Sequence, residues 1–455
     1  MLTYELKKAP GVPLYEALYR CIREDILSGA LQPGMKLPSK RALSAHLEVS
    51  KITVETAYDQ LLQEGYIRSV EKVGYFVEAV APTAPLTPMA EAPQKADEGL
   101  LDLTAGVAPI HFPFSVWSRL QRQVLLDLGQ ALLQPLPNQG LWQLRSAIAG
   151  HLAQFRGMQV SPENILIGAG TDFLYNLLVQ LLGRDKLYAV EEPGYGKIRR
   201  IYAAAGAACM DAAMDGQGVM PQALGDAQVL HISPSHHFPT GLVTPMARRQ
   251  ALLDWARQAE DRWVIEDDYD TEFRFAAHPM AAMYTMDSSR VIYMNTFSRS
   301  LAPSIRISYM VLPPVLMERF RQALGFYSCT VPSFEQYTLT RFLEQGCFEK
   351  HINRMRKYYK ARRNRVLSAI EDCPHAAHLT IREENAGLHF LVQVETAESG
   401  DALVARCHRA GIRVRTLASY YHGVTPTWTH KCLVVSYAGL TDAQLDALPG
   451  ALQKI

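Results

Sequence analysis

The chain has 455 residues, of which 20% are charged, and its formal net charge is +1. This length excludes a single ordinary hydrophobic core and predicts two domains, or one large α/β domain with an appendage. The balanced charge excludes a protein that is basic throughout, although it is compatible with a local basic surface.

Cysteine usage and apolar patterning bound the kind of protein further. The seven cysteines are scattered without paired spacing, so we expect neither a metal site nor a disulfide framework. The N-terminus has no apolar signal core, and no apolar stretch approaches the length of a membrane span. We therefore expect a soluble, cytoplasmic protein without a membrane partner.

The N-terminal region carries the pattern of two short helices joined by a tight turn. After an amphipathic run at 14–26, Ser39 is placed to cap a short helix at 40–47. A turn then leads to a second amphipathic run at 54–62, which Gly65 ends. This order predicts a helix-turn-helix.

Strand-like runs at 66–70 and 75–77 flank a turn and predict a hairpin, or wing. Three strings complete the pattern: Leu-Pro-Ser-Lys-Arg-Ala-Leu-Ser at 37–44, Val-Ser-Lys-Ile-Thr-Val at 49–54 and Gly-Tyr-Phe-Val at 74–77. With them, the region resembles the GntR family of winged-helix repressors, which implies operator DNA as the partner. By this resemblance the DNA contacts come from Lys40, Arg41, Ser50, Lys51, Thr53, Lys72 and Gly74. Cations and hydroxyls at a helix N-terminus suit phosphate contacts, and a recognition helix reads bases with its first turn.

A small helical domain that binds protein is the alternative for this region. Residues 1–78 hold ten Lys and Arg and ten Asp and Glu, so their net charge lends DNA binding no support. Between Lys36 and Lys51, however, four cations face one acid, Glu48. A local excess of cations is what binding to a DNA groove requires, and together with the motif it favours DNA.

Residues 79–98 contain four prolines and little that could pack. Such a run cannot bury enough apolar surface to fold, and its prolines favour an extended backbone. We expect an interdomain linker between a DNA-binding head, residues 1–78, and a body, residues 99–455.

The body alternates strand-like apolar runs with helical patterns, which predicts an α/β fold with a mainly parallel sheet covered on both faces. The expected strands are 165–167, 186–190, 229–232, 263–265, 291–294 and 308–312. After about residue 350 we expect a long charged helix and a smaller C-terminal α/β subdomain, with strands at 388–392 and 433–436.

Two motifs in the body have binding chemistry of their own. Gly-Ala-Gly-Thr-Asp at 168–172 follows a strand and opens a helix, so its N–H groups and the helix dipole form a phosphate cradle. Glu-Asp-Asp-Tyr-Asp at 266–270 ends a strand, at the edge where such sheets hold their ligands. The alternatives are a plain glycine turn and an acidic loop that binds a metal, although no further ligand pattern surrounds that loop.

Three further strings accompany these motifs. Two lie between them, Glu-Pro-Gly-Tyr at 192–195 and Ser-Pro-Ser-His-His-Phe-Pro-Thr-Gly at 233–241, and Thr-Phe-Ser-Arg-Ser-Leu-Ala-Pro-Ser-Ile-Arg at 296–306 comes after them. The body thereby resembles class I aminotransferases of fold type I, whose cofactor is pyridoxal phosphate. Head and body together resemble the MocR/GabR subfamily of transcription regulators. The resemblance implies cofactor contacts from Gly170, Thr171, Tyr195, Asp267, Tyr269, Thr296, Ser298, Arg299 and Arg306.

The same resemblance implies further roles. His236 or His237 lies beside the hydroxyl of the cofactor ring, although two adjacent histidines also fit a surface loop or a pH-sensitive pair. Arg415 holds the carboxylate of an amino-acid effector, with Arg413 as its rival, and either could be a surface cation.

Arg299 departs from the family pattern, in which a lysine at this place forms a Schiff base with the cofactor. A guanidinium stays protonated and delocalised, so it cannot supply the free amine that this bond needs. Asn295 stands where the family usually has glycine, and Lys197 is the nearest alternative lysine in sequence. Arg306, which holds the phosphate in the family, is intact.

These features leave three hypotheses. The first is a DNA-binding regulator whose body senses a small amine, an amino acid or the cofactor itself. The second is an active aminotransferase with a DNA-binding head, and the third is a body used only for dimerisation. Because the Schiff-base lysine is missing, we rank sensing above turnover, expect no enzyme activity and expect cofactor binding to be non-covalent. The class I body also implies a homodimer.

Overall fold

The computed structural model describes residues 2–4, 6, 13–79, 100–104, 106, 111–275, 280–385 and 387–454. The chain divides into two compact units, Met1–Ala96 and Asp97–Ile455. Apart from Ala79, the expected linker lies outside the described residues. No helix in the described ranges combines the length and apolarity that crossing a bilayer requires.

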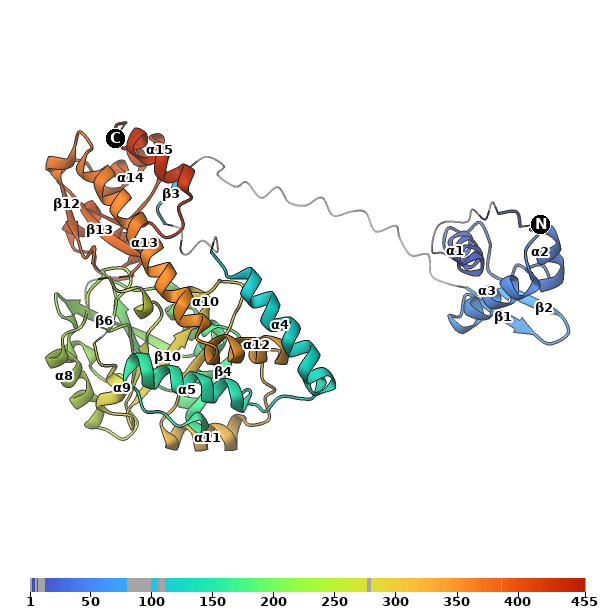
Figure 1. Ribbon diagram of the computed structural model, residues 1–455, viewed down its shortest axis with the longest axis horizontal. Coiled ribbons are helices and arrows are strands. Elements are labelled where there is room, and N and C mark those ends of the chain that lie inside the picture. Colours follow the sequence, from blue (N-terminus) through green and yellow to red (C-terminus); the bar gives the residue numbers. More distant parts are fainter. Residues whose placement is uncertain are drawn as a thin grey trace. The chain divides into compact units, whose positions relative to one another are not determined.

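The head is a helix-turn-helix followed by a wing, as predicted (Figure 1). Its elements are α1 (Leu14–Leu27), α2 (Lys40–His46), α3 (Lys51–Gln63), β1 (Ile67–Val70) and β2 (Gly74–Val77). Ser39 Oγ accepts a hydrogen bond from the Ala42 N–H and Ser50 Oγ accepts one from the Thr53 N–H, so both helices start at capping serines. Val54 and Tyr58 of α3 are fully buried in the small core.

The body is built on a mostly parallel sheet whose order among the described residues is β4-β11-β10-β9-β8-β5-β6-β7. The strands are β4 (Ile165–Gly168), β5 (Leu187–Glu192), β6 (Ala208–Asp215), β7 (Gly218–Val219), β8 (Val229–Ile232), β9 (Trp263–Asp267), β10 (Val291–Thr296) and β11 (Ser308–Val311). The α/β fold class is confirmed.

Among the strands expected from the sequence, one runs against the expectation of parallel pairing, and the short β7 is also antiparallel to its neighbour β6. β11 is antiparallel to both β10 and β4. The connection between Thr296 and Ser308 contains only the short helix α10 (Phe297–Ser300). The connection is shorter than the dozen or more residues that a parallel crossover needs. This tight connection is the segment that carries Ser298, Arg299 and Arg306.

Helices cover both faces of the sheet (Figure 1). They are α4 (Phe114–Leu128), α5 (Trp142–Arg156), α6 (Thr171–Leu182), α7 (Gly196–Ala204), α8 (Met246–Arg257), α9 (Met283–Met286), α11 (Pro314–Leu324) and α12 (Ser333–Glu344). Along β10, Val291 and Tyr293 pack in one hydrophobic layer with α5 and α12, whereas Ile292 and Met294 pack in another with α6 and α11. This alternation follows from the two-residue period of a strand.

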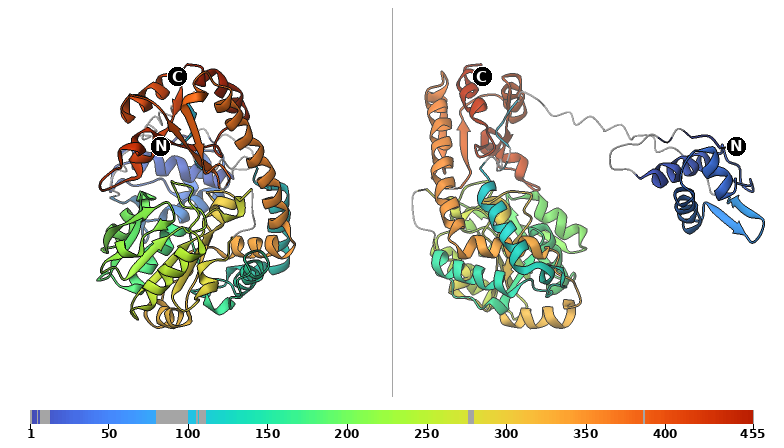
Figure 2. Two further views of the ribbon diagram at one scale, coloured as in Figure 1. Left: turned by 90° about the vertical axis from the view of Figure 1, so that its left-hand side faces the viewer. Right: turned by 45° about the vertical axis from the view of Figure 1, so that its right-hand side comes forward.

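The long helix α13 (Cys347–Glu371) leads from the large domain into the C-terminal subdomain (Figure 2). That subdomain has the antiparallel sheet β12-β13-β16-β15. Its elements are β12 (Leu379–Arg382), β13 (His389–Val394), α14 (Gly400–Arg409), β15 (Arg415–Thr416), β16 (Cys432–Ser436) and α15 (Asp442–Leu452). Beside it, β3 (Leu101–Asp102) pairs in parallel with β14 (Ile412–Arg413). The smaller α/β subdomain expected after residue 350 is thus present.

Candidate functional site

A cavity of about 760 Å³ lies where the carboxyl ends of β5, β8, β9 and β10 meet the C-terminal subdomain. Parallel strands end at one edge, so residues distant in sequence converge there. Eight of the nine expected cofactor contacts line this cavity, and the ninth, Gly170, lies directly beside it at the start of α6. The effector candidate Arg415 lines it as well.

One end of the cavity is built for an anion. Gly170 precedes α6 with φ +90°, and a Cβ there would meet the Arg306 guanidinium, 2.1 Å from Nη2. Only glycine therefore lets this arginine lie across the start of the helix. Thr171 begins α6, whose free N–H groups and dipole favour negative charge.

Two hydroxyls complete this end. Thr296 Oγ1 accepts hydrogen bonds from the Ser298 N–H at 3.1 Å and from Ser308 Oγ at 2.7 Å. Ser298 Oγ is buried and has no partner among the described residues. Since buried hydroxyls are nearly always paired, this orphan atom fits a phosphate oxygen. Arg306 itself contacts Asp172 Oδ2 at 3.4 Å.

The other end of the cavity presents a carboxylate, Asp267, at the end of β9. Tyr175 donates a hydrogen bond to its Oδ2, and the Nε2 atom of His231 lies 3.5 Å from the same oxygen. Burial raises the pKa of Tyr175 well above its usual value, so its hydroxyl keeps the proton that it donates. Oδ1 of Asp267 is buried and has no partner in the described part of the chain. It fits a pyridinium N–H.

Between these ends lie two tyrosines. Tyr195, at the start of α7, is 46% exposed, and its ring contacts Phe238 edge-on. Tyr269 is half-buried, with its hydroxyl 3.3 Å from His236 Nδ1. Burial and the neighbouring Asp270 raise the pKa of Tyr269, so it is a hydrogen-bond donor at neutral pH.

The two histidines lie behind the cavity wall. Neither His236 nor His237 is among its described lining residues. The Nδ1 atom of His236 lies 2.9 Å from Asp270, and that of His237 lies 2.7 Å from Thr240 Oγ1. Burial and the charge of His236 lower the pKa of His237 to about 3, so His237 is neutral.

Arg299 projects into the cavity from α10. Its Cζ lies 5.9 Å from the centre of the Tyr269 ring, and a Cβ on Gly106 would be only 2.8 Å from its Nη1. The alternative amine is already engaged, because Lys197 Nζ pairs with Asp172 Oδ2 at 2.6 Å.

The structure separates the two arginines proposed for the effector. Arg415 lies on β15 and lines the cavity. Arg413 lies on β14, where its Nη1 is 3.5 Å from Asp102 Oδ2, and it is not among the described lining residues. This placement favours Arg415 over its rival.

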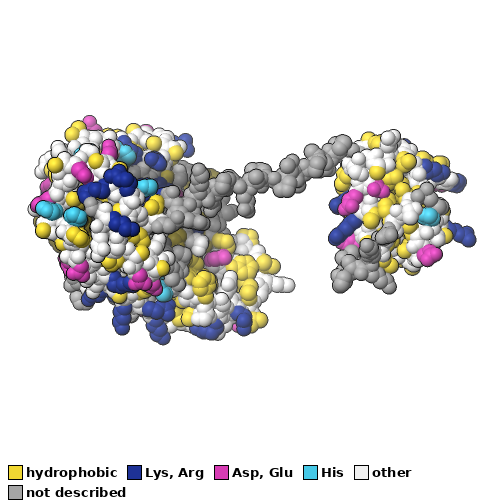
Figure 3. Space-filling model, turned by 90° about the horizontal axis from the view of Figure 1, so that it is seen from above, with side chains coloured by type: hydrophobic (Ala, Val, Ile, Leu, Met, Phe, Trp, Pro, Cys, Tyr) yellow, Lys and Arg dark blue, Asp and Glu magenta, His cyan; other side chains and the backbone are white. Residues whose placement is uncertain are grey.

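The expected DNA contacts gather at the starts of α2 and α3 and at the wing turn. Arg41, Ser50, Lys51 and Lys72 are exposed and Thr53 is half-buried, while Gly74 has φ +132° at the turn. Lys40 differs, because its Nζ pairs with Glu55 at 3.0 Å and Asp59 at 3.2 Å of α3. Figure 3 shows cations and acids distributed over the head surface.

Sequence reasoning missed three residues at these sites. Tyr175 donates a hydrogen bond to Asp267 and His231 lies beside it, but they come from α6 and β8, and no local pattern links them to β9. Ile52, in the first turn of α3, is 73% exposed. A large apolar residue on the polar side of an amphipathic helix was the available signal for Ile52.

Comparisons with known proteins agree with both units. Residues 14–77 match the family "Bacterial regulatory proteins, gntR family". The chain is 35% identical to the HTH-type transcriptional regulator YdeL of Bacillus subtilis, over 98% of this chain and 97% of that protein. It is 31% identical to the probable rhizopine catabolism regulatory protein MocR of Rhizobium meliloti, covering 96% and 92%. It is 32% identical to the pyridoxine biosynthesis regulator PdxR of Corynebacterium glutamicum, covering 88% and 87%.

Among solved structures, the body has the fold of Pyrococcus horikoshii kynurenine aminotransferase, with a TM-score of 0.67, 23% identity and coverage of 78% of this chain and 89% of that one. A multiple substrate aminotransferase from Thermococcus profundus gives a TM-score of 0.68 at 19% identity, with coverage of 82% and 96%. Fold and site thus define a transcriptional regulator with a winged head and an aminotransferase-like body. The chain belongs to the MocR/GabR subfamily of GntR-type transcription regulators.

Proposed function

We propose that this regulator binds pyridoxal phosphate in its body without a covalent bond to residue 299, and that a small amine or amino acid acts as effector at the same site. The observation that carries the proposal is a pair of buried, unpartnered polar atoms in one cavity, Asp267 Oδ1 and Ser298 Oγ. They lie at the two ends where this cofactor needs a carboxylate and a phosphate donor. The name of the relative PdxR, which refers to pyridoxine biosynthesis, supports a ligand of this class.

Each group of residues would contribute a distinct interaction. Arg306, Ser298, Thr296 and the N-terminus of α6 would hold the phosphate dianion. Asp267, oriented by Tyr175, would accept a hydrogen bond from the protonated pyridine nitrogen. The bound cofactor would supply an aldehyde that reacts reversibly with primary amines.

Arg299 would keep positive charge in the cavity while lacking a transferable proton at neutral pH. Arg415 would pair with the carboxylate of an amino-acid effector. Without a lysine at position 299 no side chain there can take and return the proton that transamination requires. We therefore place effector sensing ahead of an aminotransferase activity.

The test is a titration of the full chain with pyridoxal phosphate, followed by visible absorbance after removal of excess ligand. The proposal predicts a saturable chromophore that separates from the chain on denaturation. Adding amines and amino acids one at a time should shift the absorbance only for compounds that the body recognises. Absence of any chromophore would favour a body that serves dimerisation alone.

For the head, we propose binding to operator DNA through Arg41, Ser50, Lys51 and Thr53, with Lys72 and Gly74 at the wing. The exposure of Arg41, Ser50, Lys51 and Lys72 supports this assignment. Lys40 would support α3 through its two ion pairs rather than reach the phosphates. We add Ile52, whose exposed side chain at the first turn suits contact with a thymine methyl group.

We also propose a homodimer. Large apolar side chains are exposed on the segment of α4 that continues to Leu133 and on the segment after α11: Phe114 is 70%, Leu126 77%, Leu133 73% and Phe326 77% exposed. Such apolar exposure in a monomer marks an association surface. Sedimentation of the wild type and of Leu126→Glu tests this, since the variant should be monomeric and a dimeric variant would contradict the proposal.

A further inference from the structure

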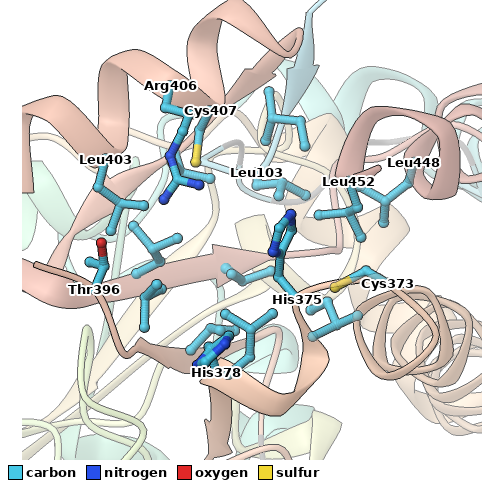
Figure 4. A pocket seen from close by; sticks show the side chains of 18 of the residues that line it. Leu103, Cys373, His375, His378, Thr396, Leu403, Arg406, Cys407, Leu448 and Leu452 are labelled. Atoms are coloured by element: carbon cyan, nitrogen blue, oxygen red, sulfur yellow. The ribbon is translucent and has the colours of Figure 1, made fainter. Parts of the chain in front are cut away.

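The C-terminal subdomain holds a second cavity of about 190 Å³, enclosed by its sheet, by α14 and α15 and by the end of α13 (Figure 4). Its inner wall is aliphatic and includes Leu379, Val392, Leu403, Leu433, Val435 and Leu448. Protein interiors are close-packed and have few voids larger than a water molecule. A cavity of this size in a small subdomain is a departure from that rule.

This cavity is distinct from the proposed cofactor site. On β16, Leu433 and Val435 line the aliphatic cavity, whereas Val434 and Ser436 line the large polar one. Successive side chains of a strand point to opposite faces, so β16 is the wall between the two cavities. Leu103 borders both cavities.

The mouth of the aliphatic cavity is polar but balanced in charge. Arg406 and His375 extend toward the middle of the opening in Figure 4. Arg406 Nε lies 3.2 Å from Glu398, and His378 Nδ1 lies 4.0 Å from Glu395. Because Arg406 already faces a carboxylate, the mouth offers hydrogen bonds without an excess of positive charge.

Apart from Arg406, Glu395 and the two histidines, the described side chains that line the cavity are uncharged. Its two thiols are Cys373 and Cys407, and burial raises the pKa of Cys407, which keeps that thiol protonated. An interior without charges penalises an ionised ligand. Volume sets the size of the occupant, since an aliphatic cavity of about 150 Å³ is enough to hold benzene.

We propose that this cavity binds a small uncharged compound with the apolar body of a single ring and one hydrogen-bonding group directed to the mouth. The probe for this class is p-cresol, and its charged counterpart is benzoate. Calorimetric titration of the full chain with p-cresol should show saturable binding. Benzoate should bind at least about tenfold more weakly because its carboxylate loses hydration.

Two neighbouring positions on α14 provide a matched pair of variants. Leu403 is buried and lines the cavity, whereas its neighbour Val404 is not among the described lining residues. Leu403→Trp should fill the cavity and abolish p-cresol binding, and Val404→Trp should retain it. Binding that survives in a folded Leu403→Trp protein, or no binding in the wild type, would overturn the proposal.

A second measurement does not depend on any variant. Cys407 lines the cavity and Cys347 is not among its described lining residues. Saturating p-cresol should slow alkylation of Cys407 by iodoacetamide severalfold and leave Cys347 unaffected. Equal rates for Cys407 with and without p-cresol would contradict the assignment even if Leu403→Trp fails to fold. Both measurements stand apart from pyridoxal phosphate binding, which involves the other face of β16.

Discussion

The head and the body present their proposed binding groups in opposite ways. In the head, Arg41 and Lys51 are exposed side chains at helix starts, and the core lies on the other side of the helices. In the body, Asp267 is 5% exposed, accepts a hydrogen bond from Tyr175 and lies beside His231. A substitution in the head should therefore change binding alone, whereas one in the body changes binding together with the polar network around it.

The largest expected effect is that of Arg306→Ala on the affinity for pyridoxal phosphate. Loss of charge-assisted hydrogen bonds to a phosphate costs about 3 kcal/mol, or roughly a hundredfold in affinity. Arg413→Ala is the matched control, because Arg413 is paired with Asp102 and is not among the described lining residues. Equal affinities of the two variants would contradict the assignment of the phosphate end.

The same variant sharpens the comparison between the two units. Arg306→Ala should leave the affinity of the cofactor-free protein for its operator unchanged, since the head carries the proposed DNA contacts. A gel-shift titration measures this. A large loss of operator affinity would show that the proposed separation of roles is wrong.

The next effect concerns the stability of the body in acid. Burial lowers the pKa of His237 to about 3 and that of His351 to about 4, and lowers the pKa of His389 well below the usual 6.5. Each takes up a proton on unfolding, so its stabilising contribution is complete above pH 6.5 and decreases as the pH falls toward the folded value. At about pH 5, His237 alone accounts for a loss of about 2 kcal/mol.

Urea unfolding followed by tryptophan fluorescence measures this, because all five tryptophans belong to the body. Between about pH 7 and about pH 5 the free energy of unfolding should fall, and His237→Asn should reduce the dependence. His408→Asn, at an exposed position of α14, should not. Identical pH profiles for all three proteins would refute the role of His237.

In the head, Lys51→Ala should weaken operator binding by about tenfold and lower the slope of log affinity against log salt by about 0.9, as expected for one lost phosphate contact. Arg20→Ala removes an exposed cation of α1 that pairs with Glu16 and serves as the control. A Lys51→Ala protein with an unchanged salt slope would exclude a phosphate contact.

The smallest expected effect is that of Ile52→Ser, about fourfold in operator affinity if one methyl-sized contact is lost. Replacing the contacted thymine by uracil should cost the wild type a similar factor and the variant nothing. If both proteins respond equally to the replacement, Ile52 does not touch that methyl group.

Much of the fold could be predicted because its signals are local. β4 and β9 begin with the apolar runs Ile-Leu-Ile and Trp-Val-Ile, and capping serines mark α2 and α3. β6, Ala208–Asp215, was not predicted, since Ala-Cys-Met-Asp-Ala-Ala-Met-Asp lacks the β-branched and aromatic residues typical of strands. The antiparallel orientation of β11 was not predicted either, because a strand's orientation depends on the length of its connection rather than on its own residues.

For the candidate site, the motifs predicted the groups that point into the cavity but not the groups that support them. Gly170, Asp267 and Arg306 belong to short strings with recognisable chemistry. Tyr175 and the wall formed by β16 come from parts of the chain that only folding brings together. Sequence patterns report local geometry, whereas hydrogen-bond partners across a sheet depend on topology.

The proposed function requires that the body hold pyridoxal phosphate without a covalent bond to any residue of the wild-type chain. The most direct test is borohydride reduction of the loaded protein, followed by denaturation and mass spectrometry of the chain. The account predicts an unlabelled wild-type chain and an Arg299→Lys chain labelled at residue 299. A wild-type chain with the label fixed at one lysine, such as Lys197, would contradict it.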